Sequence, residues 1–309
     1  MSRTDPRITW GELPLQVRDG VERLLGDSVI DAVSQSGGFS PGSADRVLLA
    51  SGRRAFIKAA SVDTNHVTVK LHRAEAAITG ALPPQLPAPE LLGMYDDGTW
   101  VALILTDVAG HHPQEPWIAS DLAAVLDALA DMEHIEVPSG LELPRYEEAL
   151  SEDFKGWERL IAKPSESVRP WASARLELLA AMAARGTSAS AGRSLVHGDL
   201  RADNILLTES GPVLVDWPWA CVGALWVDAL GVLASAKTFD HTFNAETWLA
   251  RHRVFTGVSD GDVNDVLAGL AGYFADMSRR PAPPGMPSLR DFQALQGDAV
   301  LTWLAQRMA

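Results

Sequence analysis

The sequence predicts an α+β protein with a strand-rich front and a helix-rich back. Short apolar segments bounded by turn residues occupy the first third of the chain. After Gly110, apolar residues recur at spacings of three and four, as they do in amphipathic helices. The change of pattern falls within residues 106–110. We therefore expect two lobes, residues 1–107 and residues 108–309, joined at this point.

Two hairpins and one helix are expected in the front lobe. A helix is predicted over residues 67–82 by the helical spacing of its apolar residues, and the prolines of residues 83–89 end it. Four segments have the length of strands and are expected to form two hairpins. One hairpin pairs residues 46–50 with 55–59, and the other pairs residues 90–95 with 100–105.

The back lobe is expected to be helical except around one polar motif. Ser120 is the predicted N-cap of the first helix, and Gly186 is the predicted terminator of the third. The expected helices cover residues 120–132, 146–161 and 170–185. The chain after residue 216 is also expected to be helical, apart from a proline-rich break at 281–287. Two short apolar strands are expected within residues 195–216.

Composition and charge exclude several classes of protein. The chain has 309 residues, of which 47% are hydrophobic and 21% charged, as in an ordinary globular protein. A single cysteine, Cys221, cannot form an internal disulfide, so we expect a cytoplasmic protein. A net charge of −14 argues against nucleic acid or an anionic membrane as a partner. The oligomeric state does not follow from the sequence.

The segment of residues 195–216 contains the residue types that phosphoryl transfer requires. One carboxylate must orient the attacking hydroxyl and accept its proton, and Asp199 can do this. Hard magnesium ions need oxygen ligands, and Asn204 and Asp216 can supply them. His197 stands two residues before Asp199, where it would act as a buried brace or as a second candidate for the base.

The pattern His-Gly-Asp-x-x-x-x-Asn, followed by an apolar strand and Val-Asp-Trp, resembles the aminoglycoside phosphotransferase and choline kinase-like family. The resemblance implies a two-lobed protein-kinase-like fold and a small-molecule kinase that uses Mg²⁺ and ATP or GTP. It implies catalytic roles for Asp199 and His197 and metal binding by Asn204 and Asp216. It also implies that Asp228 braces the catalytic loop.

The front lobe offers the nucleotide-binding parts that the resemblance implies. Lys58 lies inside an apolar strand, where a charge is unfavourable unless it is paired, and Glu75 on the next helix is the expected partner. An exposed edge-strand lysine and a solvated glutamate are the alternative. The backbone of Thr106 and Val108 is expected to bind adenine. A glycine-rich loop that ends at Gly42 is expected to approach the phosphates through Gly37, Gly38 and Ser40.

The expected partners are a nucleotide and a small-molecule acceptor, with an antibiotic such as an aminoglycoside favoured. A choline-like alcohol or a sugar is the alternative acceptor, and a nucleotide-binding pseudokinase is the alternative function. The acidic residues Glu147, Glu148, Glu152 and Asp153 either meet ammonium groups of the acceptor or form a solvated helix face. Trp157, Trp217 and Trp219 either line a pocket or pack in the core.

Overall fold

The computed structural model of the chain describes residues 7–35, 41–138, 140–165 and 167–309. The chain divides into two compact units, each assembled from separate segments. Unit 1 is Met1–His112, Asp203–Trp219 and Ala282–Ser288; unit 2 is Pro113–Ala202, Ala220–Pro281 and Leu289–Ala309. The lobe boundary after residue 107 stays a prediction. Among the described residues, no helix combines the length and the apolar character needed to cross a membrane.

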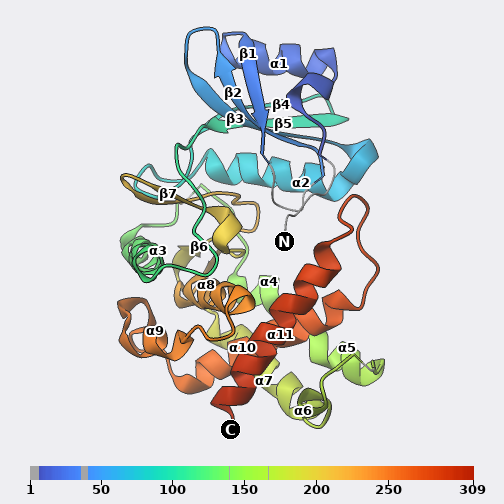
Figure 1. The fold of residues 1–309 in the computed structure, drawn as a ribbon, viewed down its shortest axis with the longest axis vertical. Coiled ribbons are helices and arrows are strands. Elements are labelled where there is room, and N and C mark those ends of the chain that lie inside the picture. Colours follow the sequence, from blue (N-terminus) through green and yellow to red (C-terminus); the bar gives the residue numbers. More distant parts are fainter. Residues whose placement is uncertain (1–6, 36–40, 139, 166) are drawn as a thin grey trace. The chain divides into compact units, whose positions relative to one another are not determined.

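Unit 1 is built on an antiparallel sheet of five strands in the order β1-β2-β3-β5-β4 (Figure 1). A short hairpin of two more strands, β7 and β8, belongs to the same unit. The elements are η1 Trp10–Glu12, α1 Leu15–Leu25, β1 Val29–Ser34, β2 Ser43–Leu49, β3 Arg54–Ser61, α2 Val62–Thr79, β4 Leu91–Asp96, β5 Trp100–Thr106, β7 Ile205–Thr208 and β8 Gly211–Leu214. The 3₁₀ turn η3 Ala202–Asn204 precedes β7.

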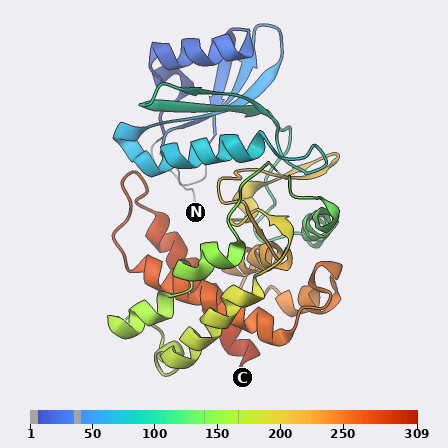
Figure 2. The ribbon, with the colours of Figure 1, turned by 180° about the vertical axis from the view of Figure 1, so that it is seen from behind.

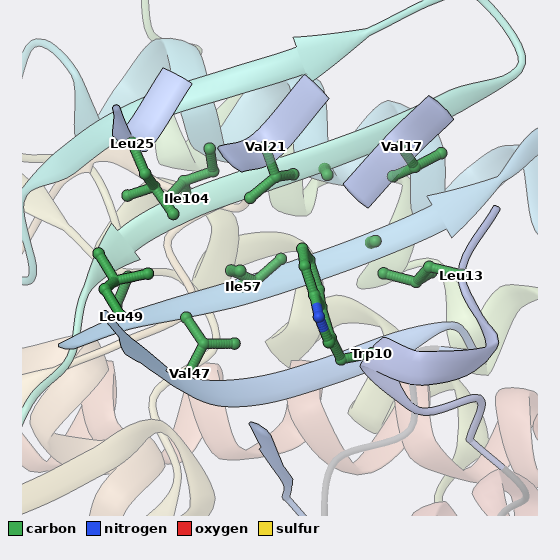
Figure 3. Packing of buried hydrophobic residues seen from close by; sticks show 12 residues of the cluster. Trp10, Leu13, Val17, Val21, Leu25, Val47, Leu49, Ile57 and Ile104 are labelled. Atoms are coloured by element: carbon green, nitrogen blue, oxygen red, sulfur yellow. The ribbon is translucent and has the colours of Figure 1, made fainter. Parts of the chain in front are cut away.

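The two faces of the five-stranded sheet carry different helices, because successive side chains of a strand point to opposite faces. On β3, Ala55, Ile57 and Ala59 belong to the apolar cluster that packs against α1. Figure 3 shows this cluster, with Val17 and Val21 of α1 above the strands. The alternate residues Phe56 and Lys58 therefore face the other side, where α2 lies (Figure 1).

The predicted elements of the front lobe are present. The strands expected over residues 46–50 and 55–59 pair as β2 and β3, and those over residues 90–95 and 100–105 pair as β4 and β5. The helix α2 begins at Val62, where Ser61 caps it, but Asn65 has non-helical backbone angles of φ −160° and ψ 104°. The Asn65 side chain accepts hydrogen bonds from the amides of Val67 and Thr68, so the regular part of the helix begins where it was predicted. Helix α1 and strand β1 were not predicted.

Unit 2 is mainly helical, and α10 packs against α5, α7 and α11 (Figure 2). Its only sheet among the described residues pairs two short strands, β6 and β9. The elements are α3 Ala119–Asp131, η2 Met132–His134, α4 Tyr146–Asp153, α5 Gly156–Ala162, α6 Pro170–Ser173, α7 Leu176–Ala189, β6 Ser194–Val196, β9 Cys221–Gly223, α8 Trp226–Phe239, α9 Ala245–Arg251, η4 Arg253–Phe255, α10 Asp260–Ser278 and α11 Leu289–Arg307.

Four details of the predicted helices were wrong. Cys221–Gly223, in the part of the chain expected to be helical, forms the strand β9 because it pairs with β6. Ser120 is not the N-cap of α3, which is Ile118. The helices predicted over residues 146–161 and 170–185 are each divided in two, into α4 and α5 and into α6 and α7. Gly186 lies inside α7 and does not end it. A Cβ at this position would lie 2.5 Å from the carbonyl oxygen of Asp265, so the glycine is needed for the close approach of α7 to α10.

Candidate active site

Lys58 holds two carboxylates of unit 1 together. Its side chain projects from β3 toward α2, where Nζ donates to both carboxylate oxygens of Glu75, at 2.8 and 2.9 Å. The same Nζ donates to Oδ1 of Asp216 at 2.7 Å. Glu75 lies on the buried side of α2 with 1% of its side chain exposed. The structure thus brings together three of the residues selected from the sequence.

The charges of this cluster depend on one another. Burial disfavours the charged form of Lys58, but Asp216 and Glu75 outweigh burial and raise the pKa of the lysine above its usual value. Burial raises the pKa of Glu75, while Lys58 and a hydrogen bond from the Trp217 backbone amide act in the opposite direction. The lysine is therefore a permanent cation that binds carboxylates in this structure and is equally suited to binding phosphate oxygens.

Asp216 has an unusual backbone conformation directly after β8. Its φ of 70° lies in the left-handed region, which residues with a side chain seldom adopt. Such strain persists where the surrounding structure imposes it, and it is concentrated at functional sites. Pairing of β7 with β8 supplies this support, and the preceding residue, Val215, donates its amide to the Asn204 carbonyl at 2.9 Å. Unit 1 therefore contains both predicted metal ligands, on adjacent segments.

His72 belongs to the same region, and the sequence analysis did not select it as a site residue. It lies three residues before Glu75, on the same side of α2, and is buried. Burial, and after it the positive charge of Lys58, lowers the pKa of the imidazole to about 3. His72 is therefore neutral near neutral pH. Its spacing from Glu75 was the signal that could have identified it.

The segment after β5 is fixed to the sheet by Arg46. The Arg46 side chain donates to Oδ1 of Asp107 at 2.6 Å and to the carbonyl oxygen of Val108. The amide of Thr106 donates to Glu90 at 2.9 Å. Within the described part of the chain, no partner is found for the amide of Val108. That amide is the group in this segment that fits the expected contact with adenine.

The predicted phosphate loop lies partly outside the described residues. Gly37, Gly38 and Ser40 fall in the segment that the structure does not describe. Gly42, at the end of the loop, has a φ of 125°, and a Cβ there would lie 2.2 Å from the carbonyl oxygen of Ala59. No other residue fits this position without moving the backbone of β3.

The His-Gly-Asp segment of unit 2 is braced by a buried carboxylate. Asp228 of α8 accepts hydrogen bonds from the amides of His197, at 2.6 Å, and Gly198, at 3.0 Å. Gly198 has a φ of 81°, which turns the loop sharply before Asp199. Burial raises the pKa of Asp228, while the His197 charge and these two amides act in the opposite direction. The structure confirms the bracing position expected for Asp228.

Asp199 is the accessible carboxylate of this loop, with 35% of its side chain exposed. Its Oδ1 pairs with the guanidinium of Arg201, two residues along the loop. His197 is completely buried, and its Nδ1 accepts a hydrogen bond from the Asp199 amide at 3.4 Å. This arrangement fits the bracing alternative for His197, and of the two residues Asp199 is the one that is exposed.

Most of the candidate acceptor residues have other contacts. Glu147 pairs with Arg145 at 3.1 Å, and Glu152 pairs with Lys155 at 2.5 Å on the surface. Of these four acidic residues, Asp153 alone is half-buried and has no ion pair with another described residue. Trp157 and Trp217 are fully buried and donate their indole N–H to backbone carbonyls, at 2.7 and 2.8 Å, so they pack in the core. Trp219 is exposed.

The braced His-Gly-Asp loop and the Lys58 cluster define a kinase-like small-molecule phosphotransferase. The chain belongs to the phosphotransferase enzyme family (APH), whose sequence model matches residues 40–273. A comparison with curated proteins found no match.

Solved structures of similar fold come from the same group of enzymes. A thermostable mutant of aminoglycoside phosphotransferase APH(4)-Ia, in complex with ADP and hygromycin B, is 15% identical over 94% of this chain and 98% of its own, with a TM-score of 0.61. Choline kinase LicA from Streptococcus pneumoniae is 14% identical over 94% and 98%, with a TM-score of 0.61. A putative fructosamine-3-kinase from Haemophilus somnus is 14% identical over 93% and 96%, with a TM-score of 0.58.

Proposed function

We propose that the protein transfers the γ-phosphoryl group of ATP or GTP to a hydroxyl of a small molecule. The observation that carries this proposal is the position of Lys58, whose ammonium is held between Glu75 and Asp216. A buried lysine with two carboxylate partners keeps its charge, and that charge is available to the α- and β-phosphates when a nucleotide binds. The alternative of an exposed edge-strand lysine does not fit these contacts.

The nucleotide would be held by unit 1. Lys58 binds phosphate oxygens, and the amide of Val108, with the backbone of Thr106, binds the base. Gly37, Gly38 and Ser40 are proposed to approach the phosphates through backbone amides. Neighbouring structures were solved with ADP and AMP-PNP, which supports a nucleotide donor for this fold.

Asn204 and Asp216 form a donor set that fits magnesium. Both supply oxygen, the ligand type that this hard cation prefers, and Mg²⁺ is commonly bound through one or two carboxylates together with phosphates. Asp216 has 38% of its side chain exposed and one carboxylate oxygen on Lys58, so it is accessible to a ligand. When bound, the ion would neutralise phosphate charge.

Asp199 would act on the acceptor. Its carboxylate orients the hydroxyl and takes its proton as the acceptor oxygen bonds to the γ-phosphorus and the bond to the diphosphate oxygen breaks. Orientation matters most here, since the transition state of phosphoryl transfer is loose. Asp228 accepts hydrogen bonds from the amides of His197 and Gly198, and these bonds fix the loop from which Asp199 acts.

An antibiotic such as an aminoglycoside is the acceptor that the family resemblance favours. The similar structures include a phosphotransferase in complex with hygromycin B and a choline kinase. Both aminoglycosides and choline therefore belong in a test. Release of ADP or GDP would be measured with Mg²⁺ and each nucleotide, against a panel of aminoglycosides, other antibiotics, choline and sugars.

The variant Asp199→Asn keeps the shape of the side chain and removes the base. We expect kcat to fall by about 10²-fold or more, with little change in nucleotide affinity. Glu177→Gln, an exposed change at the start of α7, serves as the matched control. If Asp199→Asn turns over within a few-fold of the parent, Asp199 is not the base. Nucleotide binding without phosphorylation of any acceptor would support the alternative of a nucleotide-binding pseudokinase.

A further inference from the structure

The segment Ala282–Ser288 belongs to unit 1, although the chain on either side of it belongs to unit 2. It follows α10, which ends at Ser278, and precedes α11, which begins at Leu289. We call this segment the strap. The sequence predicts only a proline-rich break between helices here. In the structure, the strap is part of the unit that carries Lys58 and the proposed nucleotide site.

The tip of the strap is a tight turn. The amide of Met286 donates to the carbonyl oxygen of Pro283 at 3.1 Å and closes the turn. Proline at the second position, Pro284, has a fixed φ. Gly285 has a φ of 77°, which fits the left-handed third position of a type II turn. The carbonyl of Pro284 takes no part in closing the turn, so it can accept a hydrogen bond from another segment.

Asn65 of α2 binds this carbonyl. Its Nδ2 donates to the oxygen of Pro284 at 3.1 Å, while its Oδ1 accepts from the amides of Val67 and Thr68, both at 3.0 Å. These three partners fix the orientation of the side-chain amide, because reversing it would oppose like groups at every contact. Asn65 is buried, with 8% of its surface exposed. One side chain thus caps the regular part of α2 and holds the strap.

The strap also lies against the residue that follows the proposed phosphate loop. This residue, Pro41, is buried, and a Cβ on Gly285 would lie 2.9 Å from the Cβ of Pro41. Only glycine permits so close an approach without a shift of one partner. The next residue, Gly42, is packed against the carbonyl oxygen of Ala59 on β3. The end of the phosphate loop therefore touches both β3 and the strap.

Both contacts of the strap reach elements that hold the nucleotide in the proposed function. Helix α2 carries Glu75, which binds Lys58, further along from Asn65. Pro41 follows the loop that is proposed to approach the phosphates. A regular helix transmits a displacement of its end along its length, so a shift at Asn65 would also move Glu75.

We propose that Asn65 is a positioning residue for the nucleotide, which it supports by anchoring the strap beside α2 and the end of the phosphate loop. Anchoring of the strap and binding of the nucleotide then favour each other, because two events that stabilise one arrangement of unit 1 are linked in both directions. This proposal rests on the proposed function for the site of the nucleotide, but it can be tested by binding alone, without turnover.

The variant Asn65→Asp separates the anchor from the helix cap. A carboxylate still accepts from the amides of Val67 and Thr68, and aspartate is favourable at a helix N-terminus, so α2 should remain capped. It cannot donate to Pro284, and its oxygen repels the carbonyl oxygen there. We expect the dissociation constant for AMP-PNP or GMP-PNP with Mg²⁺, measured by calorimetry on the full chain, to rise about tenfold.

A matched control makes the same change at another helix cap. Asn244 is the exposed N-cap of α9 in unit 2, and its side chain accepts a hydrogen bond from the Thr247 amide. Asn244→Asp should bind nucleotide like the parent. Thermal unfolding of Asn65→Asp should also resemble that of the parent, because the cap of α2 is kept. A residue that serves only as a cap would leave nucleotide binding unchanged in both variants.

Gly285→Ala disturbs the other contact of the strap and leaves Asn65 in place. The added methyl group would meet Pro41, so we expect the dissociation constant for nucleotide to rise about fivefold. Alanine is also strained at a positive φ, and Gly257→Ala controls for this strain. Gly257 has a φ of 81°, and nothing lies within 4 Å of a Cβ added there. This control should bind nucleotide like the parent.

Hydrogen exchange reports on the strap directly. Exchange would be measured by mass spectrometry on a peptide that contains residues 282–288, with and without AMP-PNP or GMP-PNP and Mg²⁺. We expect nucleotide to slow exchange of this peptide in the parent, and we expect exchange without nucleotide to be faster in Asn65→Asp. Exchange that is the same with and without nucleotide would overturn the linkage.

The outcomes separate this proposal from the proposed function. Parental nucleotide affinity in Asn65→Asp and Gly285→Ala overturns the role of the strap and leaves the proposed function standing. Equal losses in the two control variants overturn it as well, because the effect would not be specific to the strap. If Asn65→Asp does not fold, Gly285→Ala and the exchange of the parent still decide. If the parent binds neither nucleotide, both proposals are overturned.

Discussion

Asp216 and Asp228 show two different uses of a carboxylate in this protein. Asp216, in unit 1, has 38% of its side chain exposed and binds the ammonium of Lys58. Asp228, in unit 2, has 2% of its surface exposed and binds two backbone amides. A side-chain cation can move and exchange its partner, whereas a backbone amide within a folded loop cannot. The first carboxylate is suited to a ligand site, and the second is suited to fixing a loop.

The backbone conformations of Asp216 and Asp228 also differ. Asp216 follows a strand end in the left-handed region, at a φ of 70°, whereas Asp228 lies in the first turn of the regular helix α8. Strain at Asp216 is a local loss of stability that function would explain. No such loss is found at Asp228. Replacing each residue should therefore affect different properties of the protein.

The largest expected effect is on catalysis in Asp216→Asn. We expect turnover to fall by about 10²–10³-fold, the range for removing one group that stabilises transition-state charge, since the amide is a poorer magnesium ligand and a weaker partner of Lys58. Nucleotide binding, titrated with and without Mg²⁺, should lose its magnesium dependence. Asp63→Asn, an exposed change on α2, is the control. Unchanged magnesium dependence would remove Asp216 from the metal site.

The second prediction concerns stability in Asp228→Asn. An asparagine oxygen can serve one of the two amides of His197 and Gly198, and the NH₂ group cannot accept from the other. A buried unpaired amide is unfavourable by about 1–3 kcal/mol, so the free energy of unfolding should fall by that amount. Denaturant unfolding would measure it beside Asp216→Asn, which should be affected less. Equal losses in the two variants would contradict the distinction drawn between these carboxylates.

A smaller effect is expected when Lys58 loses its buried partner. Glu75→Gln removes one of the two negative charges that raise the pKa of the lysine and loosens its position on the sheet. The dissociation constant for nucleotide should rise about tenfold, the equivalent of one charged hydrogen bond. Calorimetric titration of nucleotide would measure this change. Glu90→Gln, an exposed change outside the cluster, should bind like the parent; an unaltered constant in Glu75→Gln would show that Asp216 alone positions Lys58.

The smallest expected effect is on the reactivity of Cys221, which has 3% of its surface exposed on β9. Burial, together with the negative charge of Asp228, raises the pKa of its thiol to about 12. Alkylation at pH 8 should therefore be slow in the folded protein and fast after unfolding. In Asp228→Asn the pKa of the Cys221 thiol should fall, so the labelling rate should begin to rise at a lower pH than in the parent. Rapid labelling of the parent would show that the thiol is not buried.

The chemistry of the site could be predicted from the sequence because it depends on residue type and short spacing. The order of Asp199, Asn204 and Asp216 along the chain identified the family, and alternating or helical apolar patterns located β2 to β5 and α2. These signals are local, and the physics that produces them acts between neighbouring residues.

Contacts between distant segments could not be read in this way. Lys58 and Asp216 are 158 residues apart, and their ion pair depends on the register of the sheet and on the hairpin that turns the backbone at Asp216. The spacing of His72 from Glu75 was visible in the sequence, but its burial near Lys58 was not. Gly186 looked like a helix terminator because its role, a close approach to Asp265, involves a different helix.

The sequence by itself determined the family, the reaction class and the residues that can carry the reaction, because these follow from the chemical identity and spacing of side chains. Only the tertiary structure decided that the buried Lys58 pairs with both Glu75 and Asp216. These carboxylates lie 17 and 158 residues from Lys58 along the chain. Electrostatic interaction depends on distance in space, and folding alone sets that distance.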